Sequence, residues 1–346
     1  MSLAGYTPKM ETERKIEMMC RIQTFIFCTL ALALGLLSCA GSLWAAETYP
    51  VRPIRWVVPW PAGGVADTQA RIIADQLGKA LGQQVIVDNR TGASGVLGAD
   101  LVSKARPDGY TLLYVSTNEQ AIAQAIGLEV GYDAGQAFAP ITQFLRRPAV
   151  LVAKPGLNVR TVAGLVALAK AKGGTMSAGT PSVAHLNHFA TEIFHRRAGI
   201  EVQVVPYKGE APMITGLIGG EVDYGFGFAT TVDPYVKAGR LIALATTGAM
   251  RSPQLPDVPT FNELGMPEVE MYIWTGMAGP AGLPSSIVER LNVELAKILR
   301  NPTLKARREF ADSEIVASKP EEFRAFMVAE RLRWPKLVKE TGIKAQ

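Results

Sequence analysis

The sequence predicts an α/β fold made of two lobes that face each other across a cleft. Short apolar segments of strand length alternate with amphipathic segments of helix length over most of the chain, which favours mainly parallel sheets covered by helices. These segments fall into two sets, and the roughly 300 residues after residue 46 are enough for two domains. Because neither an internal repeat nor a low-complexity linker separates the sets, we expect short crossing strands to join the lobes.

The N-terminal segment, residues 1–46, has the pattern of a secretory signal peptide. Arg21 precedes an apolar run at residues 24–41, and small residues then lead to a predicted cleavage site after Ala46. Acidic residues are unusual ahead of such a run, so we interpret the residues before Met18 as a mis-called start or a cloning remnant. The segment predicts an exported protein.

All three cysteines lie in this leader, at Cys20, Cys28 and Cys39. A mature chain that starts after Ala46 therefore has no disulfide, no thiolate metal site and no cysteine nucleophile. Residues 36–39, Leu-Leu-Ser-Cys, resemble a lipoprotein cleavage box, so lipidation of Cys39 is an alternative to ordinary cleavage. We favour a soluble exported protein over a lipid-anchored one.

Composition excludes two further classes of protein. The formal net charge is +5, but the charges are scattered and form no basic stripe, so the sequence predicts no nucleic-acid partner. After the leader no segment approaches the length of a membrane-spanning helix. Hydrophobic residues make up 48% of the chain, which is enough for a real core in each lobe.

In the first set of segments, a continuous apolar run predicts a buried strand, and amphipathic spacing after it predicts a helix. The turn signature Pro107-Asp108-Gly109 separates a second helical segment from the strand that follows it. The expected elements are strands at 54–58, 84–88 and 111–116 and helices at 67–81 and 95–105.

The second set continues the same alternation, with apolar runs as strands and periodic segments as helices. Its expected strands are at 149–153, 175–178, 202–205, 222–228 and 241–246, and its expected helices are at 161–172, 183–197, 211–218 and 232–238. Prolines begin the last periodic segments, which predicts a helical end to the chain. These helices are expected at 284–299, 302–310 and 320–340.

Small polar residues follow several of the predicted strands, at 61–64, 116–118, 177–182 and 206–209. Open α/β sheets bind ligands at the carboxyl ends of their strands. Glycines that open a helix let backbone N–H groups approach an anion closely. Both nucleotide fingerprints are missing from the first of these loops, so a carboxylate competes with a phosphate there. For any single loop, an ordinary capped turn is the alternative interpretation.

A series of short motifs is spread over essentially the whole mature chain. They include Gly63-Gly64-x-x-Asp67, Asn89-Arg90-x-Gly92-Ala93-x-Gly95, residues 107–113 (PDGYTLL), residues 205–209 (VPYKG), Gly219-Gly220-x-x-Asp223 and residues 255–260 (LPDVPT). Together they resemble the substrate-binding receptors of tripartite tricarboxylate transporters, the Bug (Bordetella uptake gene) family. The resemblance implies a type II periplasmic-binding-protein fold. Lobe one would comprise residues 49–147 plus 273–346, and lobe two residues 148–272, with the chain crossing near 145–150 and 268–274.

The same resemblance implies a solute-binding receptor rather than an enzyme, with no cofactor and no metal. Such a receptor is a periplasmic monomer that closes on a small carboxylated compound and delivers it to the membrane components of a transporter. In this family backbone amides, small hydroxyls and waters hold most of the carboxylate. An aliphatic di- or tricarboxylate, an amino acid and an aromatic acid stay open as ligands, and a sensory receptor of the same fold stays open as a role.

The predicted ligand-binding residues lie at the strand exits of both lobes. They are Trp60, Ala62, Gly63, Gly64, Asp67, Ser116 and Thr117 from lobe one and Thr180, Ser182, His185, Tyr207, Lys208, Gly209 and Asp223 from lobe two. Asp67 cannot favour an anion, so we expect it to cap its helix, hold a water or meet an amine or hydroxyl.

Two residues depart from the family pattern. Family members commonly carry Phe where this chain has Trp60, whose indole would stack on a flat acid or merely fill space between the lobes. Glu119 follows Asn118 where relatives carry Gly-Thr, and it would repel a carboxylate unless it points away or the ligand carries an amine.

One cluster suggests different chemistry. All three histidines, His185, His188 and His195, fall on one face of a predicted helix with Glu192 between them, which is the alternative of a zinc-binding or hydrolytic protein. Ligands that follow one another along a straight helix diverge from a tetrahedral centre, so we do not favour a metal. No G-x-S-x-G or H-E-x-x-H motif supports a hydrolase.

Overall fold

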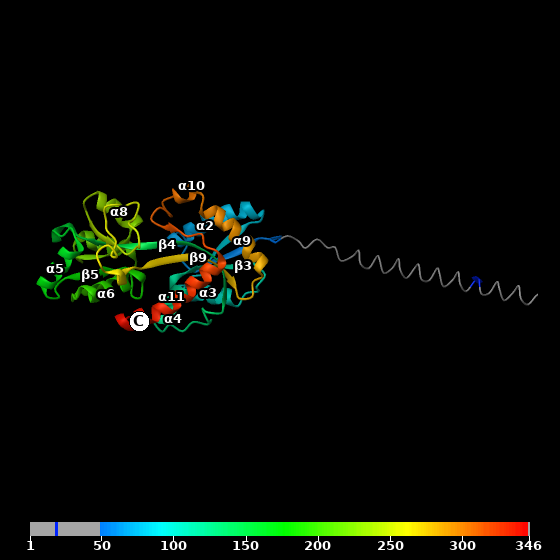
Figure 1. Cartoon of the computed structure of the whole chain (residues 1–346), viewed down its shortest axis with the longest axis horizontal. Coiled ribbons are helices and arrows are strands. Elements are labelled where there is room, and N and C mark those ends of the chain that lie inside the picture. Colours follow the sequence, from blue (N-terminus) through cyan, green and yellow to red (C-terminus); the bar gives the residue numbers. More distant parts are fainter. Residues whose placement is uncertain (1–17, 20–48, 345–346) are drawn as a thin grey trace, which may run out of the picture. The chain divides into compact units, whose positions relative to one another are not determined.

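Strands and helices alternate along the chain much as the sequence predicts (Figure 1). The first group of elements is β1 (Ile54–Val58), α2 (Val65–Leu81), β2 (Val85–Asn89), η1 (Ala93–Gly95), α3 (Val96–Ser103), β3 (Thr111–Ser116), η2 (Asn118–Ile122) and α4 (Ala123–Ala125). The long strand β4 (Phe138–Ala153) follows it.

The second group is η3 (Pro155–Leu157), α5 (Val162–Lys172), β5 (Ser177–Thr180), α6 (Leu186–Ala198), β6 (Gln203–Pro206), α7 (Glu210–Gly219), β7 (Tyr224–Phe228), α8 (Ala229–Lys237) and β8 (Ile242–Thr246). The chain ends with η4 (Pro267–Val269), β9 (Tyr272–Pro280), α9 (Ser285–Leu299), α10 (Pro302–Lys305), β10 (Glu314–Ile315) and α11 (Pro320–Thr341).

This structure is a computed structural model that describes residues 18–19 and 49–344. Apart from residues 18–19, the predicted signal peptide lies outside the described residues, as do its cleavage site and the lipidation alternative at Cys39. Residues 1–51 and 52–346 are separate units, and the description below concerns the second one. Within the described residues, no helix combines the length and the apolar character that a bilayer crossing requires.

The strands form a curled sheet in the order β2-β1-β3-β9-β4-β7-β5-β6, with β8 and β10 also paired to β4. Pairing is parallel at the two ends, where β1 joins β2 and β3 and β5 joins β6 and β7. Pairing is antiparallel in the centre, where β9 joins β3 and β4. The predicted parallel sheets are therefore present, but two central antiparallel strands connect them.

Strand β4 is the element that differs most from expectation. Its last residues, Ala149–Ala153, pair with β7 and β8, whereas residues 138–148 pair with β9. Only this last part carries an uninterrupted apolar signal. The earlier part contains two prolines and two arginines, and the register shifts twice along it. The sequence of this part therefore does not predict a strand.

Each group of strands has its own hydrophobic core, and α11 contacts both. Phe323 and Met327 at the start of α11 pack with Val57 and Leu113 of the first group. Trp334, farther along the helix, packs edge-on against Phe189 of α6, with ring centroids 5.0 Å apart. The last helix therefore binds the two groups of elements together.

Two helical predictions are only partly right. The expected helix at 302–310 ends at Lys305, because the following residues turn so that the carbonyl of Glu309 accepts hydrogen bonds from Gln69 and Arg147. The expected helix at 95–105 is shortened to Val96–Ser103, since four residues before it have positive φ angles.

Candidate functional site

A cavity of about 210 Å³ lies where the two groups of elements meet, beside the central strands. Its apolar lining comes from Trp60, Val65, Ala66, Tyr114, Leu145, Phe228 and Ile273. Its polar lining comes from Gln69, Ser116, Asn118, Arg147, His185, Glu210 and Thr275. Most of the exposed surface of the cavity is apolar, with polar groups converging on it, which is the usual form of a small-molecule site, and this volume suits a small ligand.

Three of the predicted site residues, Trp60, Ser116 and His185, line this cavity. Gly63 lines a neighbouring hollow of about 230 Å³, which shares Val65 and Arg147 with the cavity. The other predicted residues line neither space, and most of them have partners inside the protein.

The loop between β1 and α2 is held by its own polar groups. The backbone N–H of Gly63 donates to Asp67 Oδ2 over 2.9 Å, and the N–H of Gly64 donates to the carbonyl of Pro61 over 3.3 Å. Asp67 also accepts from Arg71 and Asn89. Burial raises its pKa, but these bonds outweigh that effect and hold the pKa of Asp67 below its ordinary value. Asp67 thus shapes the loop.

The exit of β3 is built around a buried carboxyl group. Glu119 accepts hydrogen bonds from the backbone N–H and the hydroxyl of Ser116. Burial nevertheless raises the pKa of Glu119 to about 7. The hydroxyl of Thr117 accepts from the backbone N–H of Trp274 over 2.9 Å, so it links β3 to β9. Glu119 does not line the cavity, which answers the concern that it would face a ligand.

The predicted residues of the second group mostly hold the strand ends together. Thr180 Oγ1 donates to the carbonyl of Ser182, and Tyr207 Oη donates to Glu221. The N–H of Gly209 donates to the carbonyl of Pro181 over 2.8 Å. Asp223 accepts from the N–H of Ser177 and pairs with Lys154 Nζ at 2.8 Å, while Lys208 is exposed.

His185 is the N-cap of α6, and its Nδ1 accepts from the N–H of Asn187 over 3.3 Å. Burial lowers the pKa of His185 to about 4, so the ring is neutral at pH 7. A neutral ring that accepts at Nδ1 carries its proton on Nε2, which leaves one N–H donor beside the cavity.

The histidine face does not form a metal centre. His188 Nδ1 accepts from the N–H of Ala184, and His195 Nε2 lies 2.6 Å from the hydroxyl of Tyr224. Among the residues that the structure describes, no three His, Cys, Asp or Glu side chains converge as metal ligands would. The zinc alternative therefore has no geometric support.

Five polar lining residues were not predicted: Gln69, Asn118, Arg147, Glu210 and Thr275. Arg147 Nε lies 2.8 Å from Asp312 Oδ1, and its Nη2 donates to the carbonyl of Glu309 over 2.8 Å. No sequence pattern singled out Arg147, because it precedes the predicted strand 149–153 and follows a second arginine, Arg146. Glu210 begins α7 directly after the predicted turn at 207–209, so the motif stopped one residue short.

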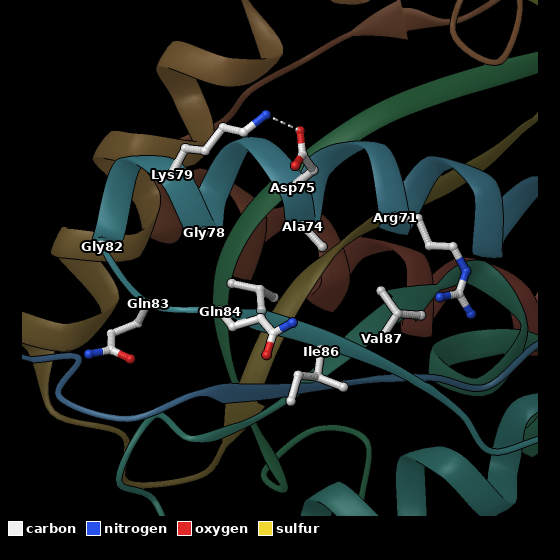
Figure 2. A pocket seen from close by; sticks show the side chains of 11 residues that line it. Arg71, Ala74, Asp75, Gly78, Lys79, Gly82, Gln83, Gln84, Ile86 and Val87 are labelled. Atoms are coloured by element: carbon white, nitrogen blue, oxygen red, sulfur yellow. Dashed lines mark hydrogen bonds and ion pairs between the residues drawn. The ribbon is translucent and has the colours of Figure 1, made fainter.

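A larger hollow of about 660 Å³ lies along α2 and the edge strand β2 (Figure 2). Figure 2 shows the Lys79–Asp75 ion pair on the helix, 2.6 Å between Nζ and Oδ2, above Ile86 and Val87 of the strand. None of the residues that line this hollow also lines the cavity. Its charged side chains form ion pairs at the surface, Arg71 with Asp67 and Lys79 with Asp75. We therefore place the candidate site at the smaller cavity.

The family model described as "Tripartite tricarboxylate transporter family receptor" matches residues 69–343. The chain belongs to this receptor family. It is 35% identical over 300 residues to the "UPF0065 protein in tcbD-tcbE intergenic region" of Pseudomonas sp. (strain P51), covering 86% of this chain and 89% of the relative. It is 34% identical over 301 residues to "Protein BugT" of Bordetella pertussis, covering 87% and 92%. The predicted family is confirmed.

Solved structures agree with the family in fold. "Structure of periplasmic binding protein BugD" has a TM-score of 0.72 at 30% identity, covering 86% of this chain and all of that one. "R. palustris Rpa4515 with adipate" has a TM-score of 0.75 at 33% identity, covering 86% and 99%. "MatC (Rpa3494) from Rhodopseudomonas palustris with bound malate" has a TM-score of 0.70 at 27% identity, covering 84% and 100%. The two-lobed α/β receptor fold is confirmed, and the family consists of solute-binding receptors rather than enzymes.

Proposed function

We propose that this protein is a periplasmic receptor that captures a small carboxylated compound in its cavity and delivers it to the membrane components of a tripartite tricarboxylate transporter. The observation that carries this proposal is an arginine at the wall of a small, mostly apolar cavity in a receptor of this family. Two structural relatives that hold adipate and malate support a carboxylate as the ligand.

Arg147 and His185 are the proposed anchors of the carboxylate. Arg147 uses Nε and Nη2 for Asp312, Ser313 and the carbonyl of Glu309, whereas its Nη1 has no hydrogen bond to any described residue. The Nε2–H of His185 is the second donor beside the same cavity. Two donors, one of them charged, suit a carboxylate better than any neutral group.

Lobe closure belongs to the same proposal. In this proposal, lobe one comprises residues 49–147 plus 273–346 and lobe two comprises residues 148–272. Strands β4 and β9 cross between the two lobes. Asp312 Oδ2 accepts from the N–H and the hydroxyl of Thr230 over 3.1 and 3.0 Å, so a loop of lobe one touches α8 of lobe two beside Arg147. A ligand on Arg147 would therefore act next to a contact that closes the cleft.

A thermal-shift screen tests the proposal. The mature protein is melted with mono-, di- and tricarboxylic, aromatic and amino acids, each beside its methyl ester as the uncharged control. A ligand at one hundred times its Kd stabilises the native state by about 2.7 kcal/mol, which raises Tm by several degrees. No shift with any acid, or equal shifts with acids and esters, would contradict the proposal.

Small-angle scattering tests closure separately. The radius of gyration is measured with and without the best ligand of the screen at saturation. We expect a smaller value with the ligand, because the two lobes move together on it. An unchanged scattering curve would mean that the cavity is already formed before the ligand binds.

A further inference from the structure

The charges around the cavity do not favour a ligand with two negative charges. Arg147 is the one cationic side chain among the described lining residues, and Asp312 already pairs with it at 2.8 Å. Glu210 lines the same cavity, and Glu119 lies behind Ser116. His185 is neutral at pH 7. A second carboxylate would therefore meet one or two acidic groups and no further cation.

Two acceptors at the cavity are available to a ligand. Asn118 is only 8% exposed, and its Oδ1 has no hydrogen-bond partner among the residues that the structure describes. The half-buried carboxyl of Glu210 accepts a hydrogen bond from the N–H of Phe228 over 2.5 Å and one from the side chain of Thr231, and its two oxygens have capacity for more. Unfilled acceptors at a binding cavity call for a ligand that donates hydrogen bonds.

Donors at the same cavity come from Arg147 Nη1 and His185 Nε2, as described above. The cavity thus offers a cationic donor group and an acidic acceptor group, and apolar side chains line the space around them. We propose that the cavity selects a compound that carries both a carboxylate and an ammonium group on an apolar body, such as an apolar α-amino acid. Its carboxylate binds Arg147 and His185, and its ammonium binds Glu210 and Asn118.

The energetics of Glu210 support this assignment. Burial raises its pKa to about 7, despite the hydrogen bonds from Phe228 and Thr231 and the charge of Arg147. An ammonium group of the ligand would stabilise the ionised form, because it compensates a carboxylate that is shielded from water. A plain acid gives no such compensation and requires Glu210 to stay protonated.

The apolar part of the ligand has a place of its own. Trp60, Leu145, Phe228 and Ile273 line the cavity between the polar groups, and they come from four different elements or loops. The volume of about 210 Å³ limits the body to a few carbon atoms or one ring. Leucine and phenylalanine are therefore suitable probes.

The inference rests on the proposed function, and one set of titrations tests both. Calorimetry is run with leucine, its des-amino analogue 4-methylpentanoate, its descarboxy analogue isopentylamine, and succinate. The phenylalanine series, with 3-phenylpropanoate and phenethylamine, is run in parallel. We expect the amino acid to bind the wild-type protein at least tenfold more tightly than its des-amino analogue, because a charged hydrogen bond is lost. The amine alone should bind even more weakly.

The variant Glu210→Gln sharpens the test, with Glu289→Gln as its control at an exposed site on α9. Glu210→Gln should reduce the preference for the amino acid over its des-amino analogue to less than threefold, while Glu289→Gln should keep it. Tighter binding of 4-methylpentanoate or succinate by the wild type would overturn the inference but leave the proposed function standing. Binding of no acid at all would overturn both. An unchanged preference in Glu210→Gln would overturn the role of Glu210.

A pH series on the wild-type protein needs no variant. Glu210 faces Phe228 on β7, Thr231 on α8, Arg147 on β4 and Asp312 in the loop before β10. Since the ammonium group requires ionised Glu210, amino-acid affinity should rise up to tenfold per pH unit below pH 7 and become constant above it. Affinity for the plain acid, which requires protonated Glu210, should be constant below pH 7 and fall above it. Parallel pH profiles for the two ligands would count against the assignment.

Discussion

Two acidic residues near strand ends occupy similar positions in the two groups of elements but have different surroundings. Glu119 lies in η2 after β3, and Glu210 begins α7 after β6. Each accepts a backbone N–H from the end of a strand, and burial raises the pKa of each to about 7. Glu119 is fully buried and uses both oxygens for Ser116, whereas Glu210 is half-buried and lines the cavity. The first stabilises the fold, and the second is free to meet a ligand.

The largest expected effect concerns stability. Glu119→Ala should lower the free energy of unfolding by about 2–4 kcal/mol, because the Ser116 N–H and hydroxyl lose their partner and a void remains. Glu210→Ala should cost about 1–2 kcal/mol, since the hydrogen bonds from the N–H of Phe228 and the side chain of Thr231 are lost but the site lies next to an existing cavity. Urea unfolding at pH 6 measures both. Equal losses, or a larger loss at Glu210, would show that the two carboxyl groups have the same role.

The pH dependence of stability separates the two groups further. Each carboxyl has a folded pKa above its unfolded value, so the stability it contributes is complete below about pH 4.5 and is lost as the pH rises to about 7. Relative to Glu119→Gln or Glu210→Gln, the free energy of unfolding of the wild type should fall by up to roughly 3 kcal/mol across this window. Subtracting the stability curve of each variant from that of the wild type removes the contributions of His185 and His195, which both proteins share. The pKa of each histidine is lowered to about 4, so their contributions have the opposite slope.

Ligand should distinguish the two titrations. With a saturating amino acid, the pH-dependent loss due to Glu210 should disappear, whereas the loss due to Glu119 should persist. The control Glu289→Gln should follow the wild type at every pH, because its side chain is exposed. Two identical curves with ligand would remove the distinction between the two regions.

His185 allows a smaller test at the cavity. His185→Ala should cost about 1 kcal/mol of stability because the N-cap bond to the N–H of Asn187 is lost. His185→Asn retains a capping oxygen and should be nearly neutral for stability. Both variants lack the Nε2–H donor, so both should weaken carboxylate binding in calorimetry by about tenfold. Full affinity in His185→Asn would mean that this histidine only caps its helix.

The smallest expected effect is at Trp60. Trp60→Phe removes part of a half-buried aromatic surface at the cavity and should change stability by less than about 0.5 kcal/mol. Affinity for phenylalanine should fall about threefold more than affinity for leucine, because the indole is the larger stacking partner. An equal change for the two ligands would mean that Trp60 fills space between the lobes.

The sequence by itself determined the alternation of strands and helices, the family and the loops at which a ligand could be held. These features depend on local patterns, such as apolar periodicity, turn residues and glycines, and local patterns are legible within one segment. Trp60, Ser116 and His185 were predicted because each stands at a strand exit or at a helix start, and all three line the cavity.

Only the tertiary structure decided which polar groups face the ligand. Arg147 lies in a part of β4 that the sequence does not predict as a strand. Its hydrogen-bond acceptor, the carbonyl of Glu309, is 162 residues away along the chain. Glu210 meets the N–H of Phe228 18 residues later. Whether a buried charge is paired, shielded or open to a cavity depends on which distant segments pack against it. That packing comes from both groups of elements together, so no single segment of the sequence contains it.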